Sequence, residues 1–211
     1  PVWYGSCIPY NASSVSYIPN TSPLTQWWSN ITGIGTAQND GWKLVWQVND
    51  AGTSNGDAAI IYKKLSASDL TDFFTNGGKL SAQIKNISAS APTSTAANLL
   101  ASYLEIARGK NTAKWEKRYT FVFWVDADKT PTIIGLTDNS TTYINPSNSA
   151  YQYKVVGGAN QYNTYELIYD PATDTIDLWV NGVERISNFP GNTVDPGYAT
   201  QINGNAAVVF G

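Results

Sequence analysis

The stretch YELIYDPATDTIDLWVNG, residues 165–182, decides the fold class. Two runs rich in Tyr, Leu, Ile, Trp and Val flank a polar Pro-Ala-Thr-Asp link, which predicts an antiparallel β-hairpin. Because strand side chains alternate between faces, the hairpin has one core face and one mixed face. The predicted core pairs are Tyr165–Val180, Leu167–Leu178 and Tyr169–Ile176, and the mixed pairs are Glu166–Trp179 and Ile168–Asp177. A buried sheet face rarely mixes carboxylates with an indole, so the mixed face is the first candidate for function.

Most of the remaining chain also reads as strands separated by Gly, Asn, Asp and Ser. The segment 66–78 is an exception, because a Ser cap, helical spacing of Leu70, Phe73 and Phe74 and a Gly stop predict one short helix. Residues 96–109 fit a helix or a buried strand, and a strand is favoured because the chain leads directly into RYTFVFWV, residues 118–125. The further predicted strands are GWKLVWQV (41–48), AAIIY (58–62), GKLSAQIKN (78–86), TPTIIGL (130–136), YQYKVV (151–156) and NAAVVF (205–210). The pattern predicts an all-β, antiparallel β-sandwich or jelly roll with one short helix.

The length of 211 residues suits one β-sandwich domain. We expect a single domain over residues 1–211, in which residues 1–40 form an extended, irregular lead-in packed on the sandwich. Hydrophobic residues make up 42% of the chain and charged residues 14%, which leaves enough apolar surface for a core. The net charge of −3 argues against nucleic acid and anionic membranes as partners. No apolar run approaches the roughly 18 residues of a membrane-spanning helix.

Five N-glycosylation sequons favour a secreted protein whose leader has been removed. The acceptor residues are Asn11, Asn20, Asn30, Asn86 and Asn139. Cys7 is the single cysteine, so no disulfide forms within the chain, and we expect its thiol to be buried or paired outside the chain. Histidine is absent, which excludes His-based triads, His general bases and His-ligated zinc. Any catalysis therefore depends on carboxylates, Tyr, Lys or Arg.

Two segments resemble a known superfamily. YELIYDPATDTIDLWVNGVERI (165–186) resembles the late hairpin of concanavalin A-like, laminin G-type jelly rolls, and FVFWVDADKTPTIIGL (121–136) is similar to their preceding meander. Lectin-like modules of secreted sialidases and other glycosidases are the most similar members, over about residues 100–185. The resemblance implies glycan binding as the commonest role. The same fold hosts glucanases and polysaccharide lyases, so function has to be argued from the site.

A carbohydrate site follows from the parity of two strands. In residues 117–127, parity places Arg118, Trp124 and Asp126 on the face opposite the aromatic core set. If these strands belong to the sheet of the hairpin, one concave surface presents a glycan or polysaccharide site made of Trp179, Glu166, Asp177, Trp124, Arg118 and Asp126. Aromatic faces cover the C–H patches of sugars while polar groups bind their hydroxyls. The competing interpretation is that both tryptophans are buried in packing.

Three alternatives stay open. A polysaccharide-degrading enzyme would use Glu166 and Asp177, whose diagonal spacing suits glycoside hydrolysis, or a Tyr base such as Tyr165. The Glu-x-Asp-x-x-Glu string of the glucanases is absent, as is the Gln-x-His motif of the lyases. A module that binds protein through a flat sheet face is the second alternative. One structural Ca²⁺ is a further hypothesis, with oxygen ligands drawn from Asn49, Asp50, Asn55, Asp57, Asp126, Asp128, Asp138 and Asn139.

Overall fold

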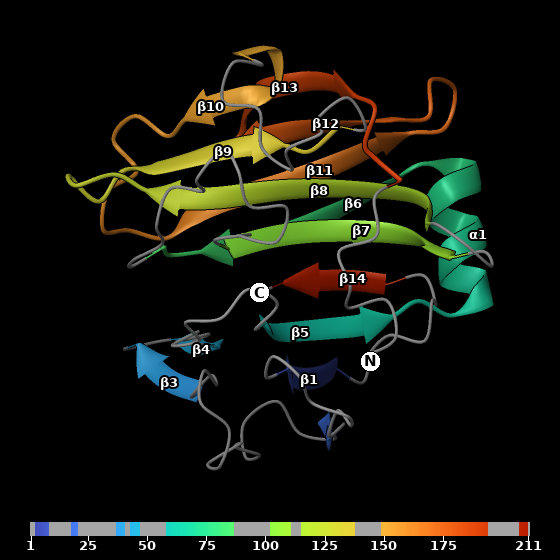
Figure 1. The fold of residues 1–211 in the computed structure, drawn as a ribbon, viewed down its shortest axis with the longest axis horizontal. Coiled ribbons are helices and arrows are strands. Elements are labelled where there is room, and N and C mark those ends of the chain that lie inside the picture. The colour runs from blue at the N-terminus through green and yellow to red at the C-terminus, as the bar shows by residue number, and fades with distance from the viewer. Residues whose placement is uncertain are drawn as a thin grey trace.

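A computed structural model gives the fold of the protein (Figure 1). It describes residues 3–8, 18–20, 37–40, 43–46, 58–86, 102–110, 115–137, 149–193 and 207–210. Side chains are described within residues 65–86, 102–109, 116–137, 150–193 and 208–209. Predictions about residues outside these ranges stay predictions.

Two antiparallel sheets form the body of the described structure. The larger has eight strands in the order β10-β9-β8-β7-β14-β5-β1-β2. Its strands are β1 (Trp3–Ile8), β2 (Ile18–Asn20), β5 (Ala58–Lys64), β7 (Ser102–Lys110), β8 (Trp115–Val125), β9 (Pro131–Gly135), β10 (Gln152–Lys154) and β14 (Ala207–Phe210). The smaller has four strands in the order β13-β12-β11-β6. Its strands are β6 (Gly78–Ile84), β11 (Asn163–Asp170), β12 (Thr175–Val180) and β13 (Val183–Phe189). A separate ribbon pairs β3 (Ala37–Asp40) with β4 (Lys43–Trp46).

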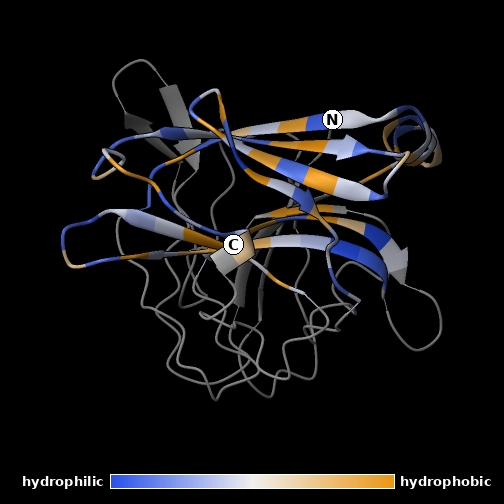
Figure 2. Ribbon diagram, turned by 90° about the horizontal axis from the view of Figure 1, so that it is seen from above, coloured by the Kyte–Doolittle hydropathy of each residue, from blue (hydrophilic) through white to orange (hydrophobic). Residues whose placement is uncertain are grey.

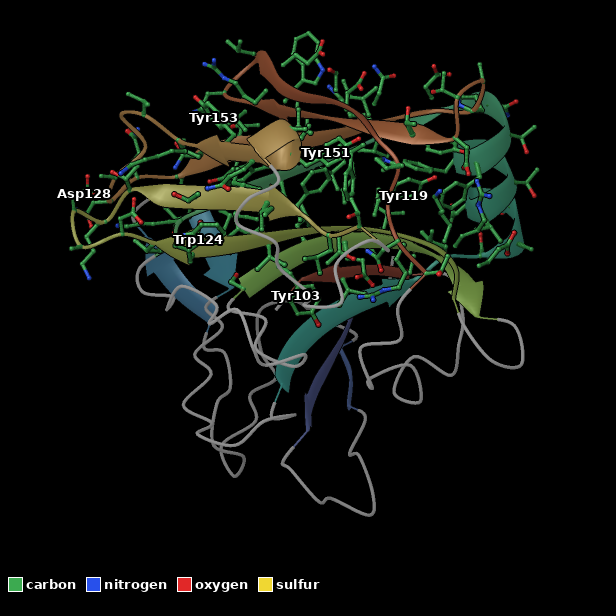
Figure 3. All side chains as sticks on the ribbon, turned by 45° about the horizontal axis from the view of Figure 1, so that its top comes forward. Tyr103, Tyr119, Trp124, Asp128, Tyr151 and Tyr153 are labelled. Carbon is green, nitrogen blue, oxygen red and sulfur yellow. The ribbon has the colours of Figure 1, made fainter. Side chains whose placement is uncertain are left out.

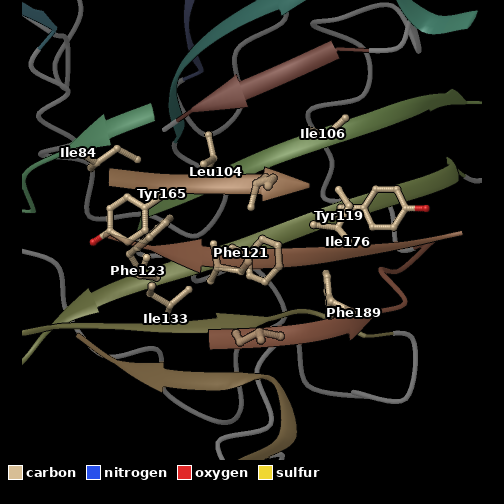
Figure 4. Packing of buried hydrophobic residues seen from close by; sticks show 14 of the residues in the cluster. Ile84, Leu104, Ile106, Tyr119, Phe121, Phe123, Ile133, Tyr165, Ile176 and Phe189 are labelled. Carbon is tan, nitrogen blue, oxygen red and sulfur yellow. The ribbon is translucent and has the colours of Figure 1, made fainter. Parts of the chain in front are cut away.

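The core fills the space between the two sheets. From the large sheet, Phe121 and Phe123 contact Phe189 and Tyr165 of the small sheet, with ring centroids 4.7 and 5.0 Å apart (Figure 4). All four residues are fully buried. Viewed from above, the sheets form two stacked layers whose strands alternate between hydrophobic and hydrophilic residues (Figure 2). Burial of one face of each sheet is therefore what holds the sandwich together.

The hairpin of β11 and β12 has the predicted register. Its Cα partners are Tyr165–Val180, Glu166–Trp179, Leu167–Leu178, Ile168–Asp177, Tyr169–Ile176 and Asp170–Thr175. The following turn between β12 and β13 has positive φ at Asn181 and Gly182, 52° and 79°. An Asn-Gly pair tolerates this conformation, which suits the twist of an antiparallel hairpin.

The short helix predicted after Leu65 is α1 (Ala67–Asn76). Ser66 is its N-cap: the Ser66 hydroxyl accepts the Asp69 amide, and the Asp69 carboxylate accepts the Ser66 amide. The helix ends at Gly77 and lies at one end of the sandwich (Figure 1). Its Phe74 ring packs edge-on against Tyr169, with centroids 5.0 Å apart. A short 3₁₀-helix (Ser149–Tyr151) precedes β10.

The all-β sandwich with one short α-helix is confirmed for the described residues, and residues 102–110 form a strand as favoured. Within the expected lead-in, residues 3–8 and 18–20 form the paired strands β1 and β2, and β1 also pairs with β5. Residues 3–8 contain Trp, Tyr, Cys and Ile, so this stretch supplies a strand despite the Ser- and Asn-rich surroundings.

Candidate functional site

The outward face of the small sheet is the candidate site, and we call it the Trp179 face. On this face Trp179 lies between two acidic residues, because its Cα partners are Glu166 on β11 and Glu184 on β13. Ser81 on β6 is the next residue across, opposite Glu166. Residues directly opposite each other in a sheet project to the same side. The face comprises Lys79, Ser81, Gln83, Thr164, Glu166, Ile168, Asp177, Trp179 and Glu184.

The Trp179 face is open to solvent. The Trp179 side chain is partly exposed, and Ser81, Gln83 and Glu184 are exposed. Ile168 is partly exposed and lies diagonally from Trp179, so the two form an apolar strip with polar side chains around it.

Hydrogen bonds hold both predicted carboxylates of this face in place. The Lys79 Nζ lies 2.7 Å from Glu166 Oε1, and only 18% of the Glu166 side chain is exposed. The Asp177 Oδ1 accepts the Asn188 amide at 2.8 Å, beside the irregular register of β12 and β13. These contacts hold each carboxylate in a defined position.

The prediction that Trp124, Arg118 and Asp126 share this surface is wrong. They belong to β8 and the turn after it, in the large sheet, whereas Trp179, Glu166 and Asp177 belong to the small sheet. The outward faces of the two sheets point in opposite directions, so the two predicted halves of the site are separated by the core. Strand parity was correct for both strands, but parity does not say which strands are neighbours.

The outward face of the large sheet is buried at the described side chains in the middle of β7, β8 and β9, while Glu116 of β8 and Lys154 of the edge strand β10 are exposed. Arg118 is fully buried and Trp124 is 9% exposed (Figure 3 labels Trp124). The Arg118 guanidinium donates to the carboxylate of fully buried Glu105. Thr120 Oγ1 donates to the same carboxylate at 2.6 Å. Arg118 therefore neutralises a buried carboxylate, which leaves it unsuited to meet a sugar acid.

Asp126 and Asp128 lie in the turn between β8 and β9 and face a lysine. Lys154 Nζ is 2.6 Å from Asp126 Oδ2 and 3.9 Å from Asp128 Oδ2. Hydrogen bonds within the turn from the backbone and side chain of Thr130 hold the pKa of Asp128 below its ordinary value. No group of three or more metal-ligating side chains occurs in the described part of the chain. The other calcium candidates, residues 49–57, Asp138 and Asn139, lie outside the described residues, so the calcium hypothesis stays a prediction.

Tyr165 does not fit the role of a catalytic base. Its ring is fully buried in the core against Phe123, and burial raises the pKa of its hydroxyl well above the ordinary value. A base has to reach the proton that it abstracts. The Tyr alternative for an enzyme is therefore wrong at this residue.

A second charged cluster, absent from the predictions, lies near α1. The Asp174 Oδ1 accepts hydrogen bonds of 2.8 Å from each of Tyr119, Tyr169 and Arg108. Lys117 Nζ is 3.6 Å from Asp174 Oδ2. Partial burial would raise the pKa of Asp174, but the hydrogen bonds from both tyrosines and the nearby cations outweigh it and lower that pKa. The cluster ties the β11–β12 turn to the large sheet. Sequence reasoning had no signal for this cluster beyond an Asp in a turn, because Arg108 and Tyr119 come from other strands, distant in the chain.

Asn86 is the one predicted glycosylation acceptor whose side chain is among those described. Asn86 follows β6 and its side chain is 7% exposed, with no hydrogen-bond partner for Oδ1 in the described structure. A glycan is attached at the side-chain amide, so burial argues against modification of Asn86 in the folded protein. Side chains at Asn11, Asn20, Asn30 and Asn139 lie outside those described.

Comparison with known proteins gives no family: no protein-family model matches the sequence, and no curated protein does. Among the described residues, no helix is both long enough and apolar enough to cross a membrane. The geometry of the Trp179 face is therefore the main evidence for a function.

Proposed function

We propose that this protein is a lectin-like carbohydrate-binding protein or module that binds a glycan on the Trp179 face. One observation supports it above all: a partly exposed indole stands at the centre of a polar sheet face. A tryptophan at a surface offers a ligand a large apolar ring and an N–H donor together.

The chemistry of the face suits a sugar ring. The indole of Trp179 covers the C–H patch of a pyranose, and the Ile168 side chain extends this apolar strip by one strand. Ser81, Gln83 and Glu184 surround the strip with donors and acceptors for sugar hydroxyls. Because the strip runs across neighbouring strands of a sheet, we propose a chain of sugars as the ligand rather than one small molecule.

We also propose that the fold is a concanavalin A-like jelly roll and that the protein is secreted. Both are supported by the resemblance of residues 121–136 and 165–186 to lectin-like modules, and the second also by the sequons. Degradation of the glycan is not part of the proposal. Glu166 is paired with Lys79 and Asp177 accepts a backbone amide, so both carboxylates already have protein partners.

The test is a glycan array probed with the intact protein, followed by affinity measurements with Trp179→Ala. We expect binding of at least one glycan class without release of reducing or unsaturated sugar ends, and a loss of affinity of about tenfold or more in the variant. Val156→Ala is the control, since Val156 is 82% exposed and follows β10, an edge strand of the large sheet.

Unchanged affinity in a folded Trp179→Ala protein would remove the site. Cleavage of the bound glycan would show an enzyme in place of a lectin. Absence of any glycan binding would favour a module that binds protein.

A further inference from the structure

The charges around Trp179 are mostly negative. Glu166 and Glu184 are its direct neighbours across the sheet, and Asp177 precedes it by two residues on the same face of β12. Of the nine residues of this face the one cation is Lys79, and its Nζ already lies 2.7 Å from Glu166. Lys85 lies just past the end of β6, with its Nζ 6.0 Å from the ring centroid of Tyr162. A ligand over the indole therefore meets two further carboxylates, those of Asp177 and Glu184.

All three arginines of the chain are placed elsewhere. Arg118 is buried against Glu105 in the other sheet, and Arg108 donates to Asp174 at the end of the sandwich. Arg185 stacks on Tyr153 of β10, with 4.7 Å between its guanidinium carbon and the ring centroid. Recognition of a sugar carboxylate normally uses an arginine fork, and the Trp179 face offers none.

We infer that the glycan bound over Trp179 is uncharged there, and that the carboxylates of Glu184 and Asp177 exclude acidic sugars such as sialic and uronic acids. This inference rests on the proposed function and adds the substrate class. A carboxylate accepts hydrogen bonds from sugar hydroxyls but can donate none, so neutral sugars gain contacts here while acidic sugars meet repulsion. Glu184 is the specificity-determining residue to test first, because it is exposed and directly opposite Trp179.

The experiment compares matched ligands that share a backbone and differ only in charge. Suitable pairs are an oligosaccharide with and without terminal sialic acid, and a glucan oligomer with its 6-carboxyl derivative. Affinities are measured for wild type, Trp179→Ala, Glu184→Gln and a control, Glu116→Gln, which removes an exposed carboxylate from β8 of the other sheet.

We expect the wild type to prefer the neutral member by about tenfold or more at low salt, with a smaller ratio at high salt. Glu184→Gln should reduce that ratio about threefold or more, and Glu116→Gln should leave it unchanged. An unchanged ratio in Glu184→Gln would overturn the role of this residue.

Two results separate the inference from the proposed function. If acidic ligands bind as tightly as neutral ones and Trp179→Ala abolishes both, the inference is wrong and the site stands. If neither ligand class binds, or if Trp179→Ala changes nothing, the proposed site fails and the inference fails with it.

Discussion

At the scale of single residues, Asp174 joins the two sheets. Its carboxylate accepts hydrogen bonds from Tyr119 and Arg108 of the large sheet and from Tyr169 of the small one. The backbone at Asp174 has a positive φ of 53°, which Asp tolerates better than most residues. One side chain thus closes a turn and links two layers.

Asp174→Asn tests this role through the pH dependence of stability. The folded pKa of Asp174 is lowered, so its contribution is present above the ordinary pKa of 3.8 and is lost as pH falls through the folded value. We expect the variant to lose about 1–2 kcal/mol at neutral pH, a modest figure because 44% of the Asp174 side chain is exposed. In acid the difference between the proteins should shrink. Urea unfolding across the acid range measures both effects.

The control for this experiment is Asp170→Asn in the same turn. The Asp170 carboxylate accepts hydrogen bonds only from Ala172 and Thr173 among the described groups, so it links no second sheet. We expect a smaller change in stability. Equal losses in the two variants, or a constant difference down to low pH, would contradict the role of Asp174.

At the scale of elements, the hairpin was predictable because its information is local. Alternation of apolar and polar residues sets the faces of β11 and β12, and a short link sets their register, so the five predicted Cα pairs follow from adjacent sequence. The cap at Ser66 was predictable for the same reason. The sequence did not identify Glu184 and Lys79 as residues of the site. The alternation of residues in 78–86 and 183–186 indicates which face they occupy, but it does not show that these strands flank the hairpin.

The sequence did not allow us to predict which strands, distant along the chain, pair with each other in a sheet. Arg118 and Trp124 have the parity that the sequence implied, but β8 pairs with β7 and β9 and not with the hairpin. Such pairing depends on contacts between residues that are distant in the sequence, so the sequence of one strand does not determine its neighbours. A buried arginine was also unexpected, since its partner Glu105 lies on β7 in a stretch that also fits a helix.

The ion pair of Glu105 and Arg118 joins β7 to β8 and gives an element-scale prediction. Glu105→Gln removes the carboxylate to which the fully buried Arg118 donates, so we expect a loss of about 3–5 kcal/mol in the free energy of unfolding. The double variant Glu105→Gln, Arg118→Met should lose less than the sum of the single losses. Denaturant unfolding of Glu105→Gln, Arg118→Met and the double variant measures these losses.

Glu116→Gln is the matched control for this prediction, because Glu116 is an exposed carboxylate on β8. We expect it to stay within about 0.5 kcal/mol of wild type. A Glu105→Gln protein as stable as this control would show that the buried pair does not stabilise the sandwich.

At the scale of the whole molecule, the outward faces of the two sheets differ in exposure. On that side of the large sheet the described side chains in the middle of β7, β8 and β9 are buried, including Glu105, Thr120 and Thr132. The small sheet has alternating partly exposed residues on β11 and β12, with exposed ones on its edge strands β6 and β13. Within the described residues, the Trp179 face is therefore more open to a ligand than the middle of the large sheet.

Mapping the bound glycan by amide and indole NMR shifts tests the central claim most directly. A glycan chosen from the array is titrated into the intact protein, and the shifted resonances are assigned. The account predicts that the Trp179 indole and the amides of β11, β12 and the adjoining parts of β6 and β13 shift together. Shifts confined to the large sheet, with the Trp179 indole unchanged at saturation, would contradict it.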